Sequence, residues 1–187
     1  MSEFLIELAI RISDIFSPES TVFLSVILII LSVFYLKIKK IKYKEIISVN
    51  CPNNIKGILM ISISVFIATV LSQLIKFIFK IPRPANMLIP ENGYTFPSGH
   101  ATLAFAVSSI CIFLMFKYFK NYKKYINYLY TIIFILTALL IATSRVVLHV
   151  HRPIDVIVGA LVGILSTFLS IKIYYNITRY VDKKIYK

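Results

Sequence analysis

The chain has few of the residues from which disulfide-bonded, metal-binding and acidic soluble domains are built. Its 187 residues include no Trp, two Cys, five Gly and only eight Asp and Glu. Cys51 and Cys111 are too few and too far apart in the sequence for a disulfide framework or a zinc site. The sequence contains no HExxH motif and no cluster of carboxylates, so neither a metal nor a cofactor is expected. The shortage of acidic side chains leaves a net charge of +13.

Apolar residues are abundant and gather in long runs. They make up 58% of the chain, whereas soluble domains are usually about 45–50% apolar. A membrane-spanning helix needs roughly 17–25 mostly apolar residues, and five runs reach or approach that length. The sequence therefore predicts one all-α domain over residues 1–187, a polytopic membrane helix bundle with five spans. The expected spans are residues 21–36, 58–75, 98–116, 126–144 and 154–175.

Residues 1–16 follow a different pattern. Charged residues recur every three or four positions, at Glu3, Glu7, Arg11 and Asp14, and apolar residues fill most of the other positions. This period gives a helix one polar and one apolar face, so we expect an amphipathic helix that lies in the membrane interface. If this helix crosses the membrane instead, the bundle has six spans. Acidic residues in place of a basic n-region argue against a cleavable signal peptide.

Basic residues outside the apolar runs indicate how the spans are oriented. They cluster after the first span, between the third and fourth spans, and at the C-terminus. Five alternating spans place all three clusters on one side, which the positive-inside rule assigns to the cytoplasm. We therefore expect a protein of the cytoplasmic membrane with a cytoplasmic C-terminus, and we expect no binding to nucleic acid. The clusters are residues 37–44, 117–124 and 179–187.

The opposite, outer side should be poor in basic residues, yet Lys76, Arg83 and Arg145 are expected there, close to His100 and His151. Cations that converge near a bilayer repel one another unless an anion lies between them. Phosphate is the anion that a clamp of Lys and Arg binds well. Such a clamp can also neutralise the charge on a phosphoryl group during its transfer. These residues therefore predict a phosphate site on the outer side of the membrane.

The segment Pro97-Ser98-Gly99-His100 supplies a second kind of anion site. Ser98 and Gly99 stand where a helix is expected to begin, and the backbone N–H groups at a helix N-terminus favour anions. Glycine also lets the backbone approach a ligand closely. We therefore expect Ser98 and Gly99 to contribute to phosphate binding.

The two histidines suit two different steps of phosphoryl transfer. One can attack phosphorus as a nucleophile, and the other can protonate the leaving oxygen and later activate water. If a helix begins at Pro153, Asp155 lies in its first turn and can orient His151 through one ring nitrogen. His100 has no such neighbour in the sequence. We therefore assign His151 as the nucleophile and His100 as the general acid.

Three motifs in this order resemble the signature of the type 2 phosphatidic acid phosphatase superfamily. They are Lys76-x6-Arg83-Pro84, Pro97-Ser98-Gly99-His100 and Ser144-Arg145-x5-His151-x3-Asp155, and the resemblance covers residues 76–155. It implies a helical membrane phosphatase that needs no metal. It also implies His151 as nucleophile, Asp155 as its orienting partner and His100 as general acid. The phosphate-binding residues that it implies are Lys76, Arg83, Ser98, Gly99 and Arg145.

Two positions depart from the family pattern. Ile81 stands where members often carry a second Arg, and His149 stands where members carry a small residue, often Gly. We expect both to affect contacts with the substrate headgroup and neither to take part in catalysis. Gly159 and Gly163 have the spacing of a helix-packing face, which we expect to pack within the bundle, so that a monomer is favoured.

The resemblance implies that a phosphate is hydrolysed from a membrane lipid phosphate or diphosphate at the outer face, through a phosphohistidine and without a metal. We favour undecaprenyl diphosphate as the substrate, with the 1-phosphate of lipid A and phosphatidylglycerophosphate as alternatives. Two other kinds of protein fit the same residues. A lipid phosphotransferase would pass the phosphoryl group from His151 to a lipid acceptor, and a lipid-phosphate binding or transport protein would only hold the headgroup.

Overall fold

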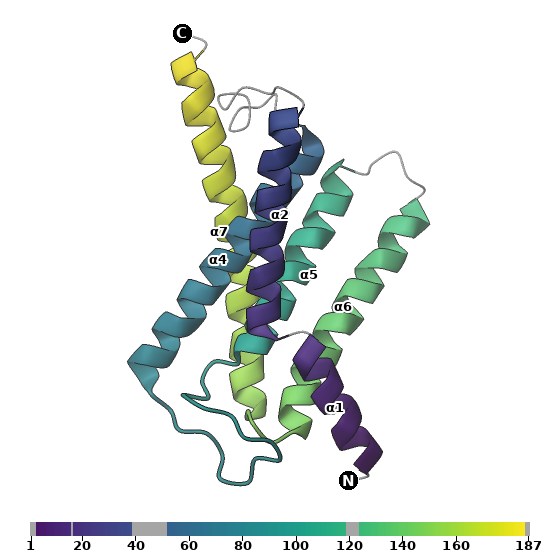
Figure 1. The fold of residues 1–187 in the computed structure, drawn as a ribbon, viewed down its shortest axis with the longest axis vertical. Helices are drawn as coiled ribbons and strands as arrows, with labels where there is room; N and C mark the ends of the chain where they lie inside the picture. The colour runs from purple at the N-terminus through teal and green to yellow at the C-terminus, as the bar shows by residue number, and fades with distance from the viewer. Residues whose placement is uncertain (1–2, 16, 39–51, 119–123, 186–187) are drawn as a thin grey trace.

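The computed structural model describes residues 3–15, 17–38, 52–118 and 124–185. These residues form six α-helices and no β-strand (Figure 1). Five segments of this part of the chain are long and apolar enough to cross a membrane, which confirms the predicted all-α membrane bundle. Residues 1, 2 and 16 of the expected interfacial helix and most of the lysine clusters at 37–44 and 117–124 lie outside the described residues. The helices are α1 (Glu3–Ile15), α2 (Pro18–Ile38), α4 (Asn53–Phe79), α5 (Gly99–Tyr118), α6 (Lys124–Val147) and α7 (Pro153–Ile185).

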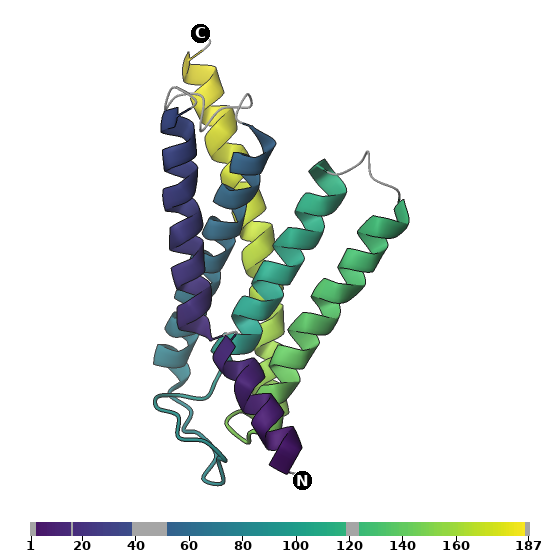
Figure 2. The same cartoon turned by 45° about the vertical axis from the view of Figure 1, so that its right-hand side comes forward.

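The amphipathic segment near the N-terminus forms α1, which is separate from α2. Its buried residues are Ala9 and Ser13, and Ala9 packs in a cluster with Leu148 and Val150. Figure 2 shows α1 beside the lower end of α6, against which it packs. The first of the five apolar segments, Glu3–Leu31, joins α1 to much of α2. The interfacial position of α1 therefore stays a prediction.

Two glycines set the distance between α5 and α7. A Cβ atom placed on Gly159 would lie 2.7 Å from the carbonyl oxygen of Ser98. A Cβ atom on Gly163 would lie 2.3 Å from the carbonyl oxygen of Thr102 and 2.8 Å from the backbone nitrogen of Ala106. Only glycine allows this close approach of two helix backbones. The small-residue face thus packs within the bundle, and it brings the start of α5 next to the start of α7.

The ends of the helices gather the predicted motifs at one end of the bundle. α4 ends at Phe79, shortly before Pro82 and Pro84, and proline cannot continue a helix. A connector of residues 80–98 leads to α5, and a second connector of residues 148–152 joins α6 to α7. Both connectors lie at the same end of the bundle, and the C-terminus lies at the opposite end (Figure 1).

Large apolar side chains cover the outside of the bundle. Phe66, Leu140, Leu161 and Phe168 are each more than half exposed. An apolar surface of this extent is unfavourable in water and marks contact with a membrane or another protein. On helices of membrane-spanning length, these side chains are placed to face lipid.

Candidate active site

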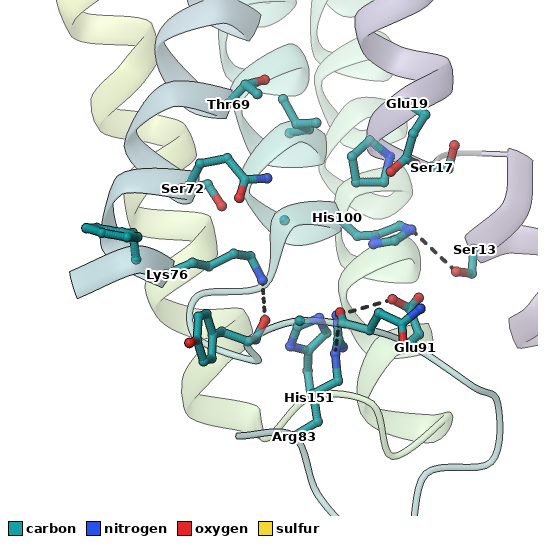
Figure 3. A pocket seen from close by; sticks show the side chains of 18 of the residues that line it. Ser13, Ser17, Glu19, Thr69, Ser72, Lys76, Arg83, Glu91, His100 and His151 are labelled. Carbon is teal, nitrogen blue, oxygen red and sulfur yellow. Dashed lines mark hydrogen bonds and ion pairs between the residues drawn. The ribbon is translucent and has the colours of Figure 1, made fainter. Parts of the chain in front are cut away.

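A cavity of about 570 Å³ lies at the end of the bundle that carries the two connectors (Figure 3). Residues of α1, α2, α4 and α5 form its walls together with both connectors. Five of the eight residues that the sequence assigns to the site line this cavity. They are Lys76, Arg83, Gly99, His100 and His151.

The other three predicted residues, Ser98, Arg145 and Asp155, are buried beside the cavity without lining it. Ser98 directly precedes α5, and its side-chain oxygen lies 3.5 Å from the backbone nitrogen of Ala101. The backbone N–H of Ser98 donates to the carbonyl oxygen of Asp155 at 2.9 Å. Ser98 therefore ties the start of α5 to the start of α7, and its contact with phosphate stays a prediction.

Backbone carbonyls of the connectors hold the two cations that reach the cavity. Lys76, in the last turn of α4, donates from Nζ to the carbonyl oxygen of Tyr94 at 2.6 Å. Arg83 donates from Nη1 to the carbonyl oxygen of Val150 at 3.1 Å and from Nη2 to that of Asn92 at 3.1 Å. A carbonyl does not neutralise a cation, so the charge of Lys76 stays available to an anion in the cavity, whereas Arg83 is also paired with the carboxylate of Glu91.

Arg145 is the third cation, and no part of it is exposed. Its Nη1 donates to the hydroxyl of Ser13, and its Nη2 donates to the carboxylate of Glu91. Its buried Nε makes no hydrogen bond to any described residue. Ser13 and Glu91 both line the cavity. Arg145 therefore adjoins the cavity through the side chains of Ser13 and Glu91.

Glu91 joins two of the three cations, and none of the three sequence motifs includes it. One carboxylate oxygen pairs with Arg145, and the other lies 3.2 Å from Nη2 of Arg83. Burial by itself would raise the pKa of Glu91, but the hydrogen bond from Arg145 and the charges of the two arginines outweigh it, so the pKa lies below its ordinary value. The available signal was its place as the only acidic residue in the connector over 81–97.

Thr95 connects His151 with Asp155, and the three motifs do not include it either. Nδ1 of His151 lies 3.7 Å from Oδ2 of Asp155, which is too far for a hydrogen bond. The hydroxyl of Thr95 lies between them, donating to Oδ2 of Asp155 at 2.6 Å and lying 3.1 Å from Nδ1 of His151. Because the one proton of this hydroxyl is given to Asp155, Thr95 accepts a hydrogen bond from Nδ1–H. Nε2 of His151 is then unprotonated and keeps its lone pair.

The first turn of α7 fixes the position of Asp155. α7 begins at Pro153, and Oδ2 of Asp155 accepts a hydrogen bond from the backbone N–H of Arg152 at 2.9 Å. A carboxylate at the third helical position that reaches back in this way is half of a capping box. The same oxygen thus caps the helix and holds Thr95, and Asp155 is 1% exposed.

The environment of His151 makes protein stability depend on pH. Burial, followed by the charges of Arg83, Arg145 and Lys76, lowers the pKa of His151 to about 2. In the unfolded chain this side chain takes up a proton as the pH falls through about 6.5, while the folded protein keeps it neutral. The free energy of unfolding should therefore decrease below pH 6.5, by up to about 1.4 kcal/mol per pH unit.

Thermal unfolding of the protein in detergent at pH 7 and pH 5 measures this effect. We expect the melting temperature to fall between the two values, and we expect a smaller fall in H151Q. H149Q is the control, because His149 is exposed. An equal fall in the wild type and in H151Q would show that His151 is not held neutral.

His100 faces α1, which no motif of the sequence analysis includes. Its Nε2 lies 3.5 Å from the hydroxyl of Ser13, the group that also accepts from Arg145. His100 is 9% exposed and lines the cavity. α1 therefore contributes a polar side chain between the second histidine and the third cation, which only the packing of α1 on α6 reveals.

His149 lies outside the site. Its side chain is exposed and its φ is +56°, a conformation that glycine adopts without steric cost. This explains in physical terms why a glycine suits the position. In this structure the ring of His149 lies 3.3 Å from the amide of Asn86, away from the residues that line the cavity.

Comparisons with known proteins identify the family to which this chain belongs. Residues 57–179 match the sequence model of the PAP2 superfamily. An undecaprenyl-diphosphatase from Sulfolobus acidocaldarius is 35% identical over 118 residues, which are 59% of this chain and 52% of that protein. The chain thus matches about half the length of this curated relative.

Two crystal structures have a similar fold. LpxE from Aquifex aeolicus superimposes with a TM-score of 0.62 at 25% identity, covering 92% of this chain and 88% of that one. A PAP2-type phosphatidylglycerolphosphate phosphatase from Bacillus subtilis superimposes with a TM-score of 0.70 at 24% identity, covering 96% and 81%. The three motifs lie around one cavity, and the family model matches more than half of the chain, so the chain belongs to the PAP2 superfamily.

Proposed function

We propose that this protein hydrolyses the terminal phosphate of a membrane lipid diphosphate, with undecaprenyl diphosphate as the favoured substrate. The observation that carries the proposal is the joint presence of two cations and two histidines around one cavity at an end of the bundle. A third cation adjoins the cavity through Ser13 and Glu91. A cavity with several cations is complementary to an anion of high charge, such as a phosphate.

The proposed reaction begins at His151. Its Nε2 lone pair attacks the terminal phosphorus, so that an N–P bond forms while the bond from phosphorus to the bridging oxygen breaks. His100 gives its proton to the leaving oxygen, which departs as the lipid monophosphate. Thr95 and Asp155 hold Nδ1–H of His151, and this contact stabilises the positive charge that the ring acquires during attack.

The second step returns the protein to its starting state. A water molecule attacks the phosphohistidine, His100 accepts a proton from this water, and the N–P bond breaks. Lys76, Arg83 and Arg145 neutralise the phosphoryl oxygens in both steps, which is the main requirement for phosphoryl transfer. In the described part of the chain, no group of three or more His, Cys, Asp or Glu side chains is arranged to hold a metal ion. Metal independence stays a prediction.

An apolar cavity next to the site supports a lipid substrate. It has a volume of about 520 Å³ and lies among α2, α4, α5 and α6, and most of the side chains that line it are apolar. Leu103 lines both this cavity and the polar one. We assign the polar cavity to the phosphates and the apolar cavity to the first part of the hydrocarbon chain, which enters sideways from the bilayer.

The orientation in the membrane is part of the proposal. The cavity lies at the end of the bundle opposite the C-terminus (Figure 1), and the last helix carries basic residues near that terminus, among them Lys183 and Lys184. The positive-inside rule assigns the C-terminus to the cytoplasm. The cavity then opens at the outer face of the cytoplasmic membrane.

Phosphate release by the purified protein tests the proposal. The panel contains undecaprenyl diphosphate, lipid A with its 1-phosphate and phosphatidylglycerophosphate, each assayed with and without EDTA. We expect the highest kcat/KM for undecaprenyl diphosphate and no loss of activity with EDTA. A strict requirement for a divalent metal, or no release of phosphate from any lipid, would contradict the proposal. A phosphorylated lipid product in place of free phosphate would indicate the phosphotransferase.

A further inference from the structure

Glu91 binds the two arginines in the way that a phosphate would. Its two carboxylate oxygens contact two different guanidinium groups, one on Arg83 at 3.2 Å and one on Arg145. A phosphate presents pairs of oxygens that are also negatively charged and that also accept hydrogen bonds from arginine. Figure 3 shows Glu91 beside Arg83 and His151, at the cavity. The carboxylate therefore occupies part of the space in which the proposed substrate would be bound.

The charges around the site make this contact and phosphate binding competitive. The carboxylates of Glu91 and Asp155 act on the cations Lys76, Arg83 and Arg145, and the cavity is also lined by Asp14 and Glu19. Asp155 is buried and hydrogen-bonded to Thr95 and to the backbone of Arg152, so it stays in place. Glu91 is the carboxylate that lines the cavity and pairs with the cations. When Glu91 moves away from the arginines, the net positive charge around the cavity increases, which favours the binding of phosphate.

Burial explains why the empty site needs such a carboxylate. Arg145 is completely buried, and a buried charge without a partner is strongly destabilising. The side chain of Glu91 is 26% exposed, whereas that of Arg145 is not exposed at all. Glu91 can therefore move from the ion pair into water, whereas Arg145 is enclosed by protein on all sides.

We propose that Glu91 is an internal competitor for the phosphate site, which stabilises Arg83 and Arg145 while the site is empty, moves aside when the substrate binds, and returns to help expel the phosphate product. Glu91 then determines how tightly phosphate is retained. This inference rests on the proposed function in one respect, because it takes Arg83 and Arg145 as the residues that bind phosphate.

Binding of inorganic phosphate to the purified protein in detergent tests the inference by isothermal titration at pH 7. E91Q removes the charge and keeps the shape and an oxygen acceptor. We expect E91Q to bind phosphate about tenfold more tightly than the wild type, since the competing charge-assisted hydrogen bonds are lost. E19Q is the matched control, because Glu19 lines the same cavity while the two arginines pair with Glu91. It should bind phosphate no more tightly than the wild type.

If E91Q does not fold, E91D gives the same test. Its shorter side chain keeps the charge but cannot reach both arginines, so phosphate affinity should rise by a smaller factor. Unchanged or weaker phosphate binding in a folded Glu91 variant would overturn the inference. An equal gain in E19Q would also overturn it, because the effect would then be one of net charge. Failure of the proposed function would be a separate result, in which the wild type releases no phosphate from any lipid.

Discussion

Replacing His151 with glutamine should lower kcat for phosphate release from the lipid substrate at least a thousandfold. Glutamine has a similar length and can still contact Thr95, but it has no lone pair that can attack phosphorus. Removing the nucleophile from an enzyme that works through a covalent intermediate typically costs about this much or more. Substrate binding should change little, because the cations that hold the phosphate are all retained. The measurement is kcat and KM on the diphosphate lipid.

Two further variants make this result specific. H149Q makes the same chemical change at a nearby exposed residue, and it should keep nearly full activity. T95V removes the hydroxyl between His151 and Asp155 and should give an intermediate loss, because the ring is then held less firmly. If H151Q kept more than a tenth of the wild-type kcat, His151 would not be the nucleophile, and the binding or transport alternative would have to be tested again.

Replacing Arg145 with lysine should reduce kcat/KM at least a hundredfold and also lower the melting temperature. Lysine keeps the charge, but its compact ammonium group cannot replace the planar guanidinium, which contacts Ser13 and Glu91 from two separate nitrogens. Arg145 is completely buried, so groups left without a partner carry the full cost of burial. The losses of activity and of thermal stability both follow from geometry, because the net charge of the protein is unchanged.

R11K is the control for this substitution. Arg11 is exposed and pairs with Glu7 on the surface of α1, where such a pair contributes little. We expect wild-type activity and stability from R11K. An R145K protein with normal kcat/KM would show that Arg145 acts only as a buried charge and does not bind phosphate.

The sequence predicts the helices well because apolar runs and proline positions are local signals. The expected span over 58–75 lies inside α4, and Pro82 and Pro84 explain why that helix ends at Phe79. The helices extend beyond the expected spans, because polar residues near the membrane surface continue a helix without adding hydropathy. α1 is visible from its charge period, but its contact with α6 is not, since packing between distant segments leaves no pattern in one sequence.

Site residues could be predicted where they belong to a motif that combines reactive side chains with a fixed spacing. Lys76, Arg83, His100 and His151 were expected together, and all four line one cavity. Glu91, Thr95 and Ser13 were missed because each depends on a partner far away in the chain. Thr95, for instance, contacts residues more than 50 positions later. The direct contact expected between Asp155 and His151 is replaced by one through Thr95, because 3.7 Å separates the two groups.

We propose that the phosphate passes through His151, and trapping the phosphohistidine shows whether it does. A diphosphate lipid labelled in its terminal phosphate is incubated with the wild type, H100A and H151Q, and the reaction is stopped in alkaline detergent, in which phosphohistidine survives. A lipid monophosphate is a good leaving group, so loss of His100 should slow the attack of water more than the first step. We expect labelled phosphate on His151, more of it in H100A than in the wild type, and none in H151Q. Labelled phosphate on another residue, or lipid hydrolysis with no labelled protein in any variant, would contradict it.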